Sequence, residues 1–242
     1  MPIVFTEALR KVYGEGEAEV CALDGVDLSV EPGEFVAVMG PSGCGKSTLL
    51  NMIGGLDHPT SGRVVIDGND LTELSDEKLT ELRRRRIGFV FQFFNLIPVL
   101  DAAENAALPL TLDGDSRAKD KARAWLEKVG LGDRLHSRPD QLSGGQQQRV
   151  TIARALSTEP ALVLADEPTG NLDSKSATEI ATLLQQVAVE WGRSVLMVTH
   201  DPRIAAYAGR LVLMKDGRIV DDLKLDGSGD AARDAMERAG LL

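Results

Sequence analysis

The sequence predicts an α/β domain with a substantially parallel sheet. Short, uninterrupted apolar runs, which are typical of strands covered on both faces, alternate with segments whose apolar residues recur every three or four positions, as on one face of a helix. The chain has 242 residues, of which 43% are hydrophobic and 26% are charged. This composition is sufficient to bury a core and excludes a chain that is disordered throughout.

The expected strands carry the apolar runs. Val26, Leu28 and Val30 alternate with other residues, as in a half-exposed strand, and the next run, 35–39, is apolar throughout. Further short apolar runs follow at 87–91, 161–165, 194–198 and 211–214. We expect these uninterrupted runs to be buried strands of one sheet.

The expected helices lie between the strands, at 47–53, at 150–156 and along a stripe from Ala177 to Trp191. Residues 93–141 contain no clear buried strand. They carry a helical stripe at 118–129, preceded by a loop at 113–116, and we interpret them as a mainly helical subdomain inserted into a single domain, 1–242. The tail, 226–242, is expected to form a linker and one surface helix.

Charge and cysteine content exclude several classes of protein. With 27 Lys and Arg against 37 Asp and Glu, the net charge of −10 argues against a protein that holds nucleic acid through phosphate contacts. Cys21 and Cys44 are too few for a disulfide framework. The first residues lack the apolar core of a signal peptide, and no segment approaches the ~20 apolar residues of a membrane-spanning helix. We expect a cytoplasmic location, where any membrane contact comes from a partner.

A phosphate-binding loop follows the apolar run 35–39. Residues 40–47 read GPSGCGKS, match the pattern GxxxxGK[ST] and open a helical segment. Glycines allow the backbone N–H groups to surround an anion, and the helix N-terminus adds positive potential. Lys46 is expected to reach the β and γ phosphates of a nucleotide, and the Ser47 hydroxyl to bind Mg²⁺. A glycine-rich turn without function is the alternative, and the order of strand, loop and helix argues against it.

Two carboxylates end the apolar run 161–165. Asp166 and Glu167 would emerge at the carboxyl end of a central strand, beside the phosphate loop. Asp166 suits the Mg²⁺ shell, and Glu167 can polarise an attacking water molecule. Without the phosphate loop, the same pair would indicate only a solvated strand end.

Three further features follow the expected strands. Gln92 follows the run 87–91 and could bind Mg²⁺ or orient water, and His200 follows 194–198, from where its imidazole could reach a γ-phosphate. Leu142-Ser-Gly-Gly-Gln146 precedes a helix that is expected from Gln147 onward, and it resembles a second anion-binding helix start. One chain offers no second γ-phosphate, which suggests that this segment serves the nucleotide of another chain.

With these motifs the chain resembles the ATP-binding subunit of ATP-binding-cassette (ABC) transporters over about residues 3–225. The match includes the signature LSGGQ at 142–146 and the loop Asn171-Leu-Asp173. The resemblance implies a RecA-like P-loop ATPase core with an antiparallel β portion near the N-terminus and an inserted helical subdomain. It implies ATP and Mg²⁺ as cofactors, an ATP-dependent head-to-tail dimer and a separate membrane permease that holds the chain at the cytoplasmic face of the membrane.

The resemblance also implies roles for individual residues. The implied catalytic residues are Lys46, Gln92, Glu167 and His200. The implied Mg²⁺ ligands are Ser47, Gln92 and Asp166. The implied nucleotide contacts are Tyr13, which would stack on adenine, and Gly40, Pro41, Ser42, Gly43, Cys44, Gly45, Lys46, Ser47, Thr48, Gln92, Ser143, Gly144, Gly145, Gln146 and Asp173.

A narrower likeness concerns the macrolide-exporter and lipoprotein-releasing branch. It rests on 13–20 (YGEGEAEV), on 88–96 (GFVFQFFNL) and on 169–173 (TGNLD). An export or lipoprotein- or peptide-release function is therefore expected. The alternatives are a regulatory ATPase whose membrane partner signals or controls cell-wall enzymes, and a soluble ABC ATPase that acts on DNA or in iron–sulfur assembly.

Other residues have plainer interpretations. The basic run 83–86 is expected on a solvated approach to the next strand, and Trp125 and Trp191 are expected to pack in the core. Cys44 lies beside N–H groups and Lys46, which can lower a thiol's pKa, but it is interpreted as an incidental loop residue. Phe93 and Phe94 fit a core position and a docking surface for the permease equally well.

Overall fold

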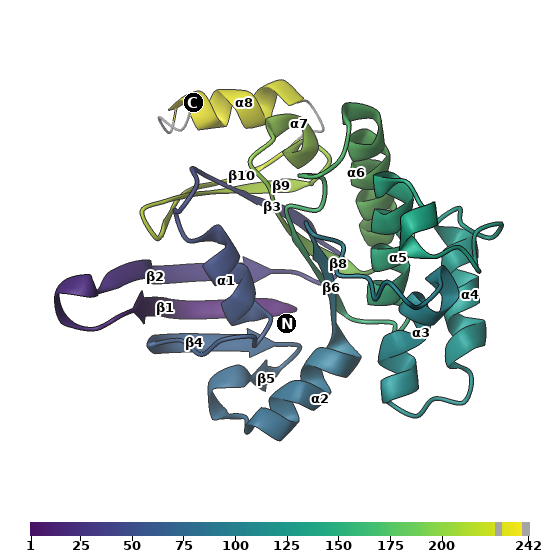
Figure 1. Cartoon of the computed structure of the whole chain (residues 1–242). Helices are drawn as coiled ribbons and strands as arrows, with labels where there is room; N and C mark the ends of the chain where they lie inside the picture. Colours follow the sequence, from purple (N-terminus) through teal and green to yellow (C-terminus); the bar gives the residue numbers. More distant parts are fainter. Residues whose placement is uncertain (226–228, 239–242) are drawn as a thin grey trace.

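The computed structural model describes residues 1–225 and 229–238 and contains two sheets with helices around them (Figure 1). The strands are β1 (Val4–Tyr13), β2 (Val20–Val30), β3 (Phe35–Met39), β4 (Ser61–Ile66), β5 (Asn69–Asp70), β6 (Ile87–Phe91), β7 (Leu162–Asp166), β8 (Ser194–Val198), β9 (Arg210–Lys215) and β10 (Arg218–Lys224). The α-helices are α1 (Lys46–Ile53), α2 (Asp76–Arg86), α3 (Ala102–Leu112), α4 (Ala118–Lys128), α5 (Gly144–Leu156), α6 (Ser174–Val189), α7 (Pro202–Ala205) and α8 (Gly229–Arg238).

The larger sheet has six strands in the order β10-β9-β3-β8-β7-β6, and all of its neighbouring pairs except β10–β9 are parallel. All five uninterrupted apolar runs are strands of this sheet, so the predicted fold class is confirmed. Register places the carboxyl ends of three strands together, because Asp166 pairs with Phe91 on one side and with Val198 on the other. The residues that follow these strands, including Gln92, Glu167 and His200, therefore emerge at one edge of the sheet.

The strand β3 shows why the central runs are apolar throughout. Val36 and Val38 face one hydrophobic core, whereas Phe35, Ala37 and Met39 belong to the core on the opposite face of the sheet. Every residue of this strand is buried, so no position along it favours a polar side chain.

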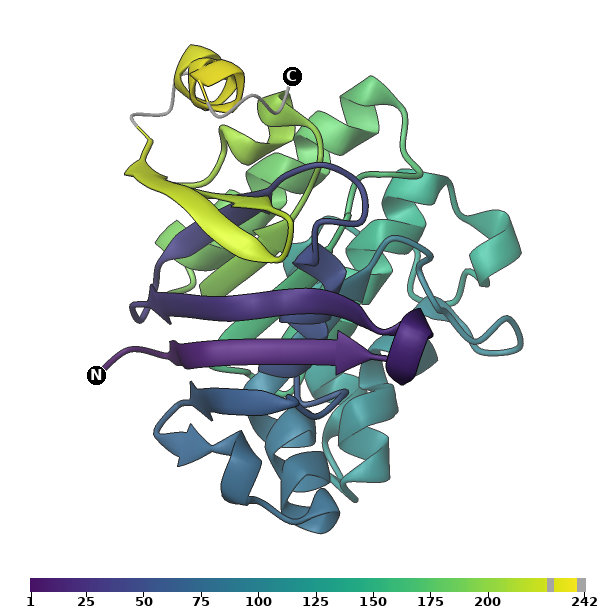
Figure 2. The same cartoon turned by 90° about the vertical axis from the view of Figure 1, so that its left-hand side faces the viewer.

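The smaller sheet is antiparallel, in the order β2-β1-β4-β5, and it agrees with the antiparallel portion implied near the N-terminus. Figure 2 shows this sheet from its outer side. Helix α1 contacts strands of both sheets and contributes Leu49, Leu50, Met52 and Ile53 to the hydrophobic core between them. The start of α1 is thereby fixed against the rigid centre of the molecule.

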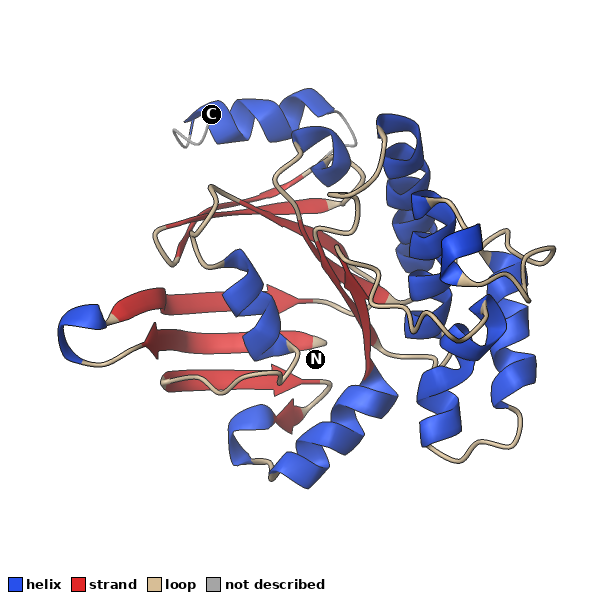
Figure 3. Cartoon of the chain, in the orientation of Figure 1, coloured by secondary structure: helices blue, strands red, loops and turns tan. Residues whose placement is uncertain are grey.

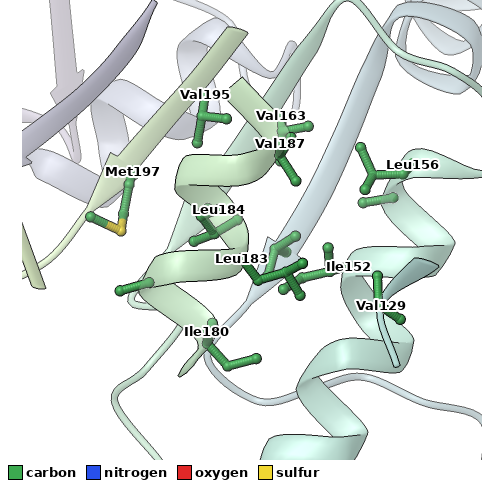
Figure 4. Packing of buried hydrophobic residues seen from close by; sticks show 14 of the residues in the cluster. Val129, Ile152, Leu156, Val163, Ile180, Leu183, Leu184, Val187, Val195 and Met197 are labelled. Atoms are coloured by element: carbon green, nitrogen blue, oxygen red, sulfur yellow. The ribbon is translucent and has the colours of Figure 1, made fainter. Parts of the chain in front are cut away.

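Helices α3 to α6 lie on the other side of the larger sheet (Figure 3). Ile180, Leu184 and Val187 of α6 pack toward β7 and β8, and Ile152 of α5 packs beside them (Figure 4). This second core joins the section 93–141, which contains α3 and α4, to the sheet. No helix among the described residues combines the length and apolar character needed to cross a membrane.

Several local expectations differ from the structure. The run 83–86 is the last turn of α2, and Leu79 and Leu82 are the buried residues that hold this otherwise polar helix in place. Helix α6 ends at Val189, before Trp191, whose ring packs edge-on against Trp125 at 5.3 Å between centroids. Strand β10 was not expected, because its exposure alternates along a polar sequence at the sheet edge. Helix α8 lies in the expected tail, and residues 226–228 and 239–242 of that tail lie outside the described residues.

Candidate functional site

The loop 40–47 connects β3 to α1, and its glycines occupy positions that only glycine fits. Gly45 has a φ of 102°, and a Cβ on it would lie 2.3 Å from the carbonyl oxygen of Ala22. A Cβ on Gly40 would lie 2.1 Å from the carbonyl oxygen of Met214. These close approaches fix the loop against β2 and β9, with the N-terminus of α1 opening toward it. The loop therefore has the rigid glycine backbone that anion binding requires.

Lys46 supplies a buried positive charge to this loop. The residue is 8% exposed, and its Nζ donates to the carbonyl oxygens of Gly40 at 2.8 Å and Pro41 at 2.9 Å. Both acceptors belong to the loop itself. The loop carbonyls therefore hold the ammonium, and no carboxylate in the described part of the chain forms an ion pair with it, so its charge is available to a bound anion.

Ser47 and Asp166 bring two oxygen-bearing side chains together beside the loop. The Ser47 hydroxyl donates to Oδ1 of Asp166 at 3.1 Å. Burial raises the pKa of Asp166, and the neighbouring Glu167 raises it further, against the opposing Ser47 hydrogen bond. Hydroxyl and carboxylate oxygens are the ligands that Mg²⁺ prefers, and a divalent cation would compensate the buried negative charge. This pair of oxygen donors fits Mg²⁺.

Glu167 and His200 form a pair at the ends of adjacent strands. The backbone N–H of Glu167 donates to the Val198 carbonyl at 2.9 Å, and its φ of 46° lies in the left-handed region. The Nδ1 atom of His200 lies 3.0 Å from both carboxylate oxygens of Glu167. The Glu167 side chain is 17% exposed and that of His200 is 69% exposed. Backbone strain of this kind at a strand end is typical of functional sites.

Gln92 pairs with the loop that follows Glu167. Its Nε2 donates to Oδ1 of Asn171 at 3.4 Å, and Nδ2 of Asn171 donates to the Gln92 carbonyl at 3.0 Å. A Cβ on Gly170 would lie 2.7 Å from the Gln92 Nε2, so the two segments are in tight contact. Gln92 is thus beside Glu167 in the fold, and its amide bonds to Asn171 in this structure.

The segment Ser143–Gln146 forms the start of α5. The helix begins at Gly144, earlier than the expected Gln147, because Ser143 caps it: the Gln146 N–H donates to the Ser143 hydroxyl at 3.3 Å, and the Gln146 side chain accepts from the Ser143 N–H at 2.9 Å. Asp173 caps α6 by accepting from the N–H groups of Lys175 and Ser176, both at 3.0 Å. Two helix N-termini therefore open side by side.

The two helix starts border one polar depression of about 480 Å³. A Cβ on Gly145 would lie 3.1 Å from the Ser176 hydroxyl oxygen, so the starts of α5 and α6 are in contact. The lining includes Ser143, Gln146 and Asp173 and contains no residue of the loop 40–47. The phosphate-type loop and this depression are therefore two separate features of the chain.

Tyr13 ends β1 and lies near the start of α1. Its residue exposure is 40%, its hydroxyl donates to Oδ2 of Asp57 at 3.0 Å, and the Thr48 side chain lies near that hydroxyl. Burial raises the pKa of Tyr13, and the Asp57 carboxylate raises it further. The ring is therefore beside the first turn of the helix that follows the phosphate loop.

Cys44 is buried in the phosphate loop, and burial raises the pKa of its thiol more than the nearby Lys46 lowers it. This result favours the interpretation of Cys44 as a loop residue without redox chemistry. Among the described residues, no group of three His, Cys, Asp or Glu side chains could hold a metal ion.

Sequence reasoning missed two side chains that position the site. Gln148 is fully buried, and its Nε2 donates to the carbonyls of Pro168 at 2.7 Å and Phe91 at 3.3 Å. Arg154 donates to the carbonyls of Phe94 at 3.0 Å and Asn95 at 2.7 Å. Helix α5 thereby holds the segments that carry Gln92 and Glu167. The run of three glutamines was the available signal, but which of them is buried depends on the fold.

Known proteins similar to this chain agree with its motifs. A family model described as "ABC transporter" matches residues 23–170. The macrolide export ATP-binding/permease protein MacB of Hyphomonas neptunium is 47% identical over 223 residues, which are 91% of this chain and 34% of that protein. An uncharacterized ABC transporter ATP-binding protein of Thermotoga maritima is 50% identical over 211 residues, which are 86% of this chain and 90% of that protein. The chain spans about a third of the length of the macrolide-export relatives it matches.

Solved structures show the same fold. The dimeric post-hydrolysis state of the ATP-binding cassette MJ0796, bound to ADP and Pi, superposes with a TM-score of 0.83 at 45% identity, covering 93% of this chain and 100% of that chain. A second dimeric structure of MJ0796 gives a TM-score of 0.84 at 45% identity, with the same coverage. The RecA-like ABC fold implied by the sequence is therefore confirmed. Because the family model matches more than half of the chain, the chain belongs to the ABC transporter family.

Proposed function

We propose that this chain is an ATPase that binds MgATP between two copies of itself and uses its hydrolysis to drive a membrane permease. The observation that carries the proposal is that one sheet carries both the buried Lys46, in the glycine loop after β3, and the Glu167–His200 pair, after β7 and β8. A phosphate-binding loop and a candidate general base would thus lie at one edge of the same sheet. The dimeric MJ0796 cassette bound to ADP and Pi supports the assignment.

The chain's residues divide the hydrolytic chemistry among them. Lys46 and the loop N–H groups would bind the phosphates and stabilise the charge that develops during transfer. Glu167 would accept the proton of the attacking water, while His200 holds that carboxylate through its Nδ1. Ser47, Asp166 and, after release from Asn171, Gln92 would hold Mg²⁺, which neutralises phosphate charge when it is bound.

The second anion-binding feature supports a head-to-tail dimer. The depression at Ser143–Gln146 is lined by none of the phosphate-loop residues, so it is free to face the nucleotide held by another copy. A two-fold arrangement gives both copies the same pair of contacts and closes the assembly at two chains. Asp173 stands at the same depression and would contribute to the shared site.

A groove beside Gln92 suits a segment of the permease. It has a volume of about 510 Å³ and is floored by Phe89 and Phe91, whose rings stack at 5.6 Å. Leu112 of α3 lies on its rim and is 71% exposed. Phe93, on the loop after Gln92, is also 71% exposed, whereas Phe94 is half-buried. These exposures favour the docking interpretation for Phe93 and assign Phe94 a partly structural position.

The occupant of this groove would be an apolar segment that the permease extends to the cytoplasmic face of the membrane. Arg154 holds the backbone of the loop between the groove and Gln92, so movement at the ATP site would reach the docked segment. The relatives named as macrolide export ATP-binding/permease proteins support an export function. We therefore place the chain at the cytoplasmic face, bound to a permease of that branch.

A mixing experiment tests the shared site. Lys46→Ala removes the loop's buried charge, and Ser143→Arg places a large cation in the depression at α5. Each variant alone should lose nearly all ATP hydrolysis. A mixture contains dimers with one site in which both elements are intact, so activity should partly recover. Ser143→Ala controls for the lost helix cap, which costs about 1 kcal/mol of stability. Full activity of Ser143→Arg alone would contradict the head-to-tail arrangement.

A further inference from the structure

Tyr13 belongs to a cluster that joins the end of β1 to the segment after α1. The Nζ atom of Lys11 donates to Oδ1 of Asp57 at 2.8 Å and to the His58 carbonyl at 2.7 Å. The other oxygen of Asp57 accepts from the Tyr13 hydroxyl at 3.0 Å. The same Lys11 ammonium lies over the Tyr13 ring, 4.8 Å from its centroid. One carboxylate thus fixes both the cation and the phenol.

The cluster is enclosed on the side of Lys11 and open on the side of Tyr13. The Lys11 side chain is only 12% exposed and that of Asp57 is 35% exposed, whereas the residue exposure of Tyr13 is 40%. Although burial opposes it, hydrogen bonds from Lys11, the His58 N–H and Tyr13 hold the pKa of Asp57 below its ordinary value. The carboxylate therefore stays charged at neutral pH and keeps both partners in place.

This arrangement leaves one ring face available. The cation covers one face of Tyr13 and the hydroxyl is tied to Asp57, so the ring cannot rotate freely. The Tyr13 hydroxyl lies near Thr48 in the first turn of α1, which follows the phosphate loop. A planar group stacks most favourably on an aromatic ring that is already immobilised, because binding then costs little side-chain entropy.

We propose that Lys11 and Asp57 are positioning residues that hold Tyr13 ready to stack on the purine base of ATP. The inference rests on the proposed nucleotide binding and on the adenine stacking by Tyr13 that the family resemblance implies, and it adds the two residues that hold the ring in place. A purely structural role, in which the ion pair only clasps β1 to the segment after α1, is the competing explanation. The positioning role and the structural role make different predictions, because base stacking contributes to the binding of ATP but not to the binding of a phosphate chain that has no base.

The test compares two ligands, ATP and inorganic tripolyphosphate, by calorimetric titration in the presence of Mg²⁺. Asp57→Ala removes the acceptor, Tyr13→Phe removes only the hydroxyl, and Lys11→Met keeps the aliphatic stem without the charge. Each of these three variants should lower the affinity for ATP about three- to tenfold, because it removes part of the free energy that one stacked base contributes. Their affinity for tripolyphosphate should stay unchanged. Asp115→Asn breaks a similar Lys–Asp pair, with Lys121 at 2.7 Å, and should change neither affinity.

A double variant separates positioning from general damage. If Asp57 acts through the Tyr13 hydroxyl, adding Asp57→Ala to Tyr13→Phe should cost much less ATP affinity than it does in the wild type. Equal losses for ATP and tripolyphosphate, or an unchanged ATP affinity in all three single variants, would overturn the inference. Failure of the wild type to bind either ligand would instead overturn the proposed function on which it rests. If Asp57→Ala does not fold, Lys11→Met and Tyr13→Phe decide by the same comparison.

Discussion

The Nδ1 atom of His200 lies 3.0 Å from both carboxylate oxygens of Glu167, which joins the ends of β7 and β8. The Glu167 carboxylate thereby has a defined orientation, reinforced by the backbone hydrogen bond of Glu167 to Val198. A base that is oriented in this way needs little rearrangement when it accepts a proton. The imidazole is the more exposed partner, so it can also approach a ligand from the solvent side.

Loss of this imidazole should affect turnover far more than binding. We expect His200→Ala to bind ATP with nearly wild-type affinity and to hydrolyse it about 10- to 100-fold more slowly, because a positioning contact to the base is lost. His136→Ala is the matched control, since its Nδ1 lies 3.2 Å from Oδ2 of Asp101, in the helical section. An equal loss of turnover in both variants would show that the Glu167 contact has no special role.

Gln148 should contribute both to the stability of the fold and to the position of the segments that carry Gln92 and Glu167. Gln148→Leu keeps a similar volume but leaves the Pro168 and Phe91 carbonyls without their donor. We expect the free energy of unfolding, measured by urea denaturation, to fall by about 1–3 kcal/mol. ATP turnover should also become slower. Gln147→Leu is the control, because that side chain donates to the carbonyl of Leu142 at 3.1 Å and to no strand-end loop among residues 1–225. The account of Gln148 fails if both variants are equally stable.

Asp201, next to His200, should give a pH-dependent contribution to stability. Hydrogen bonding from the Arg203 side chain, together with the Arg203 N–H and against the effect of burial, holds the pKa of Asp201 below its ordinary value of 3.8. The ionised Asp201 therefore stabilises the fold at pH values above 3.8. This stabilisation is lost as the pH falls through the lowered pKa that Asp201 has in the folded chain. Asp201→Ala should destabilise the chain by about 1 kcal/mol at pH 7, as expected for a helix cap.

Denaturation curves at a series of pH values check this expectation for Asp201. The difference between wild type and Asp201→Ala should narrow as the solution becomes acidic below the ordinary carboxyl pKa. Asp201→Asn separates the cap from the charge, because asparagine caps α7 equally well but loses the ionic contact with Arg203. A difference between wild type and Asp201→Ala that is independent of pH would contradict the assignment.

If the groove at Phe89 and Phe91 binds the permease, the exposed residue Leu112 on its rim should contribute to that binding. Leu112→Asp should weaken capture of the co-expressed permease by about 1–3 kcal/mol, because it would place an unpaired charge against the apolar segment in the groove. ATP binding by the isolated chain should not change. Val189→Asp is the matched control: Val189 is 77% exposed at the end of α6 and does not line the groove. Normal capture by the Leu112 variant, or equal loss in both, would remove this groove as the docking site.

The chemistry of the site could be predicted from sequence because its residues follow strands that are apolar on both faces. Glu167 and His200 each lie two residues after such a run, and parallel strands bring their carboxyl ends to one edge. The contact between them could not be predicted, because strand order and register are set by pairings between distant segments. The orientation of Gln92 toward Asn171 depends on the same packing.

The remaining differences each have an identifiable physical cause. Helix α2 carries only Leu79 and Leu82 on its buried side and ends in four arginines, so its apolar stripe is too short to detect. Gln148 has the same side chain as its neighbours 146 and 147, and only burial against Pro168 distinguishes it. The Lys11–Asp57–Tyr13 cluster joins residues that are distant in sequence, which no local pattern reveals.

The central claim, that ATP is bound between two copies and hydrolysed with Glu167 as the base, is tested most directly with Glu167→Gln. In MgATP this variant should keep its nucleotide unhydrolysed, and light scattering after size exclusion should give twice the 26.0 kDa of one chain. The double variant Glu167→Gln with Ser143→Arg should stay at 26.0 kDa. A Glu167→Gln protein that binds MgATP as a monomer, or that hydrolyses it at the wild-type rate, would contradict the account.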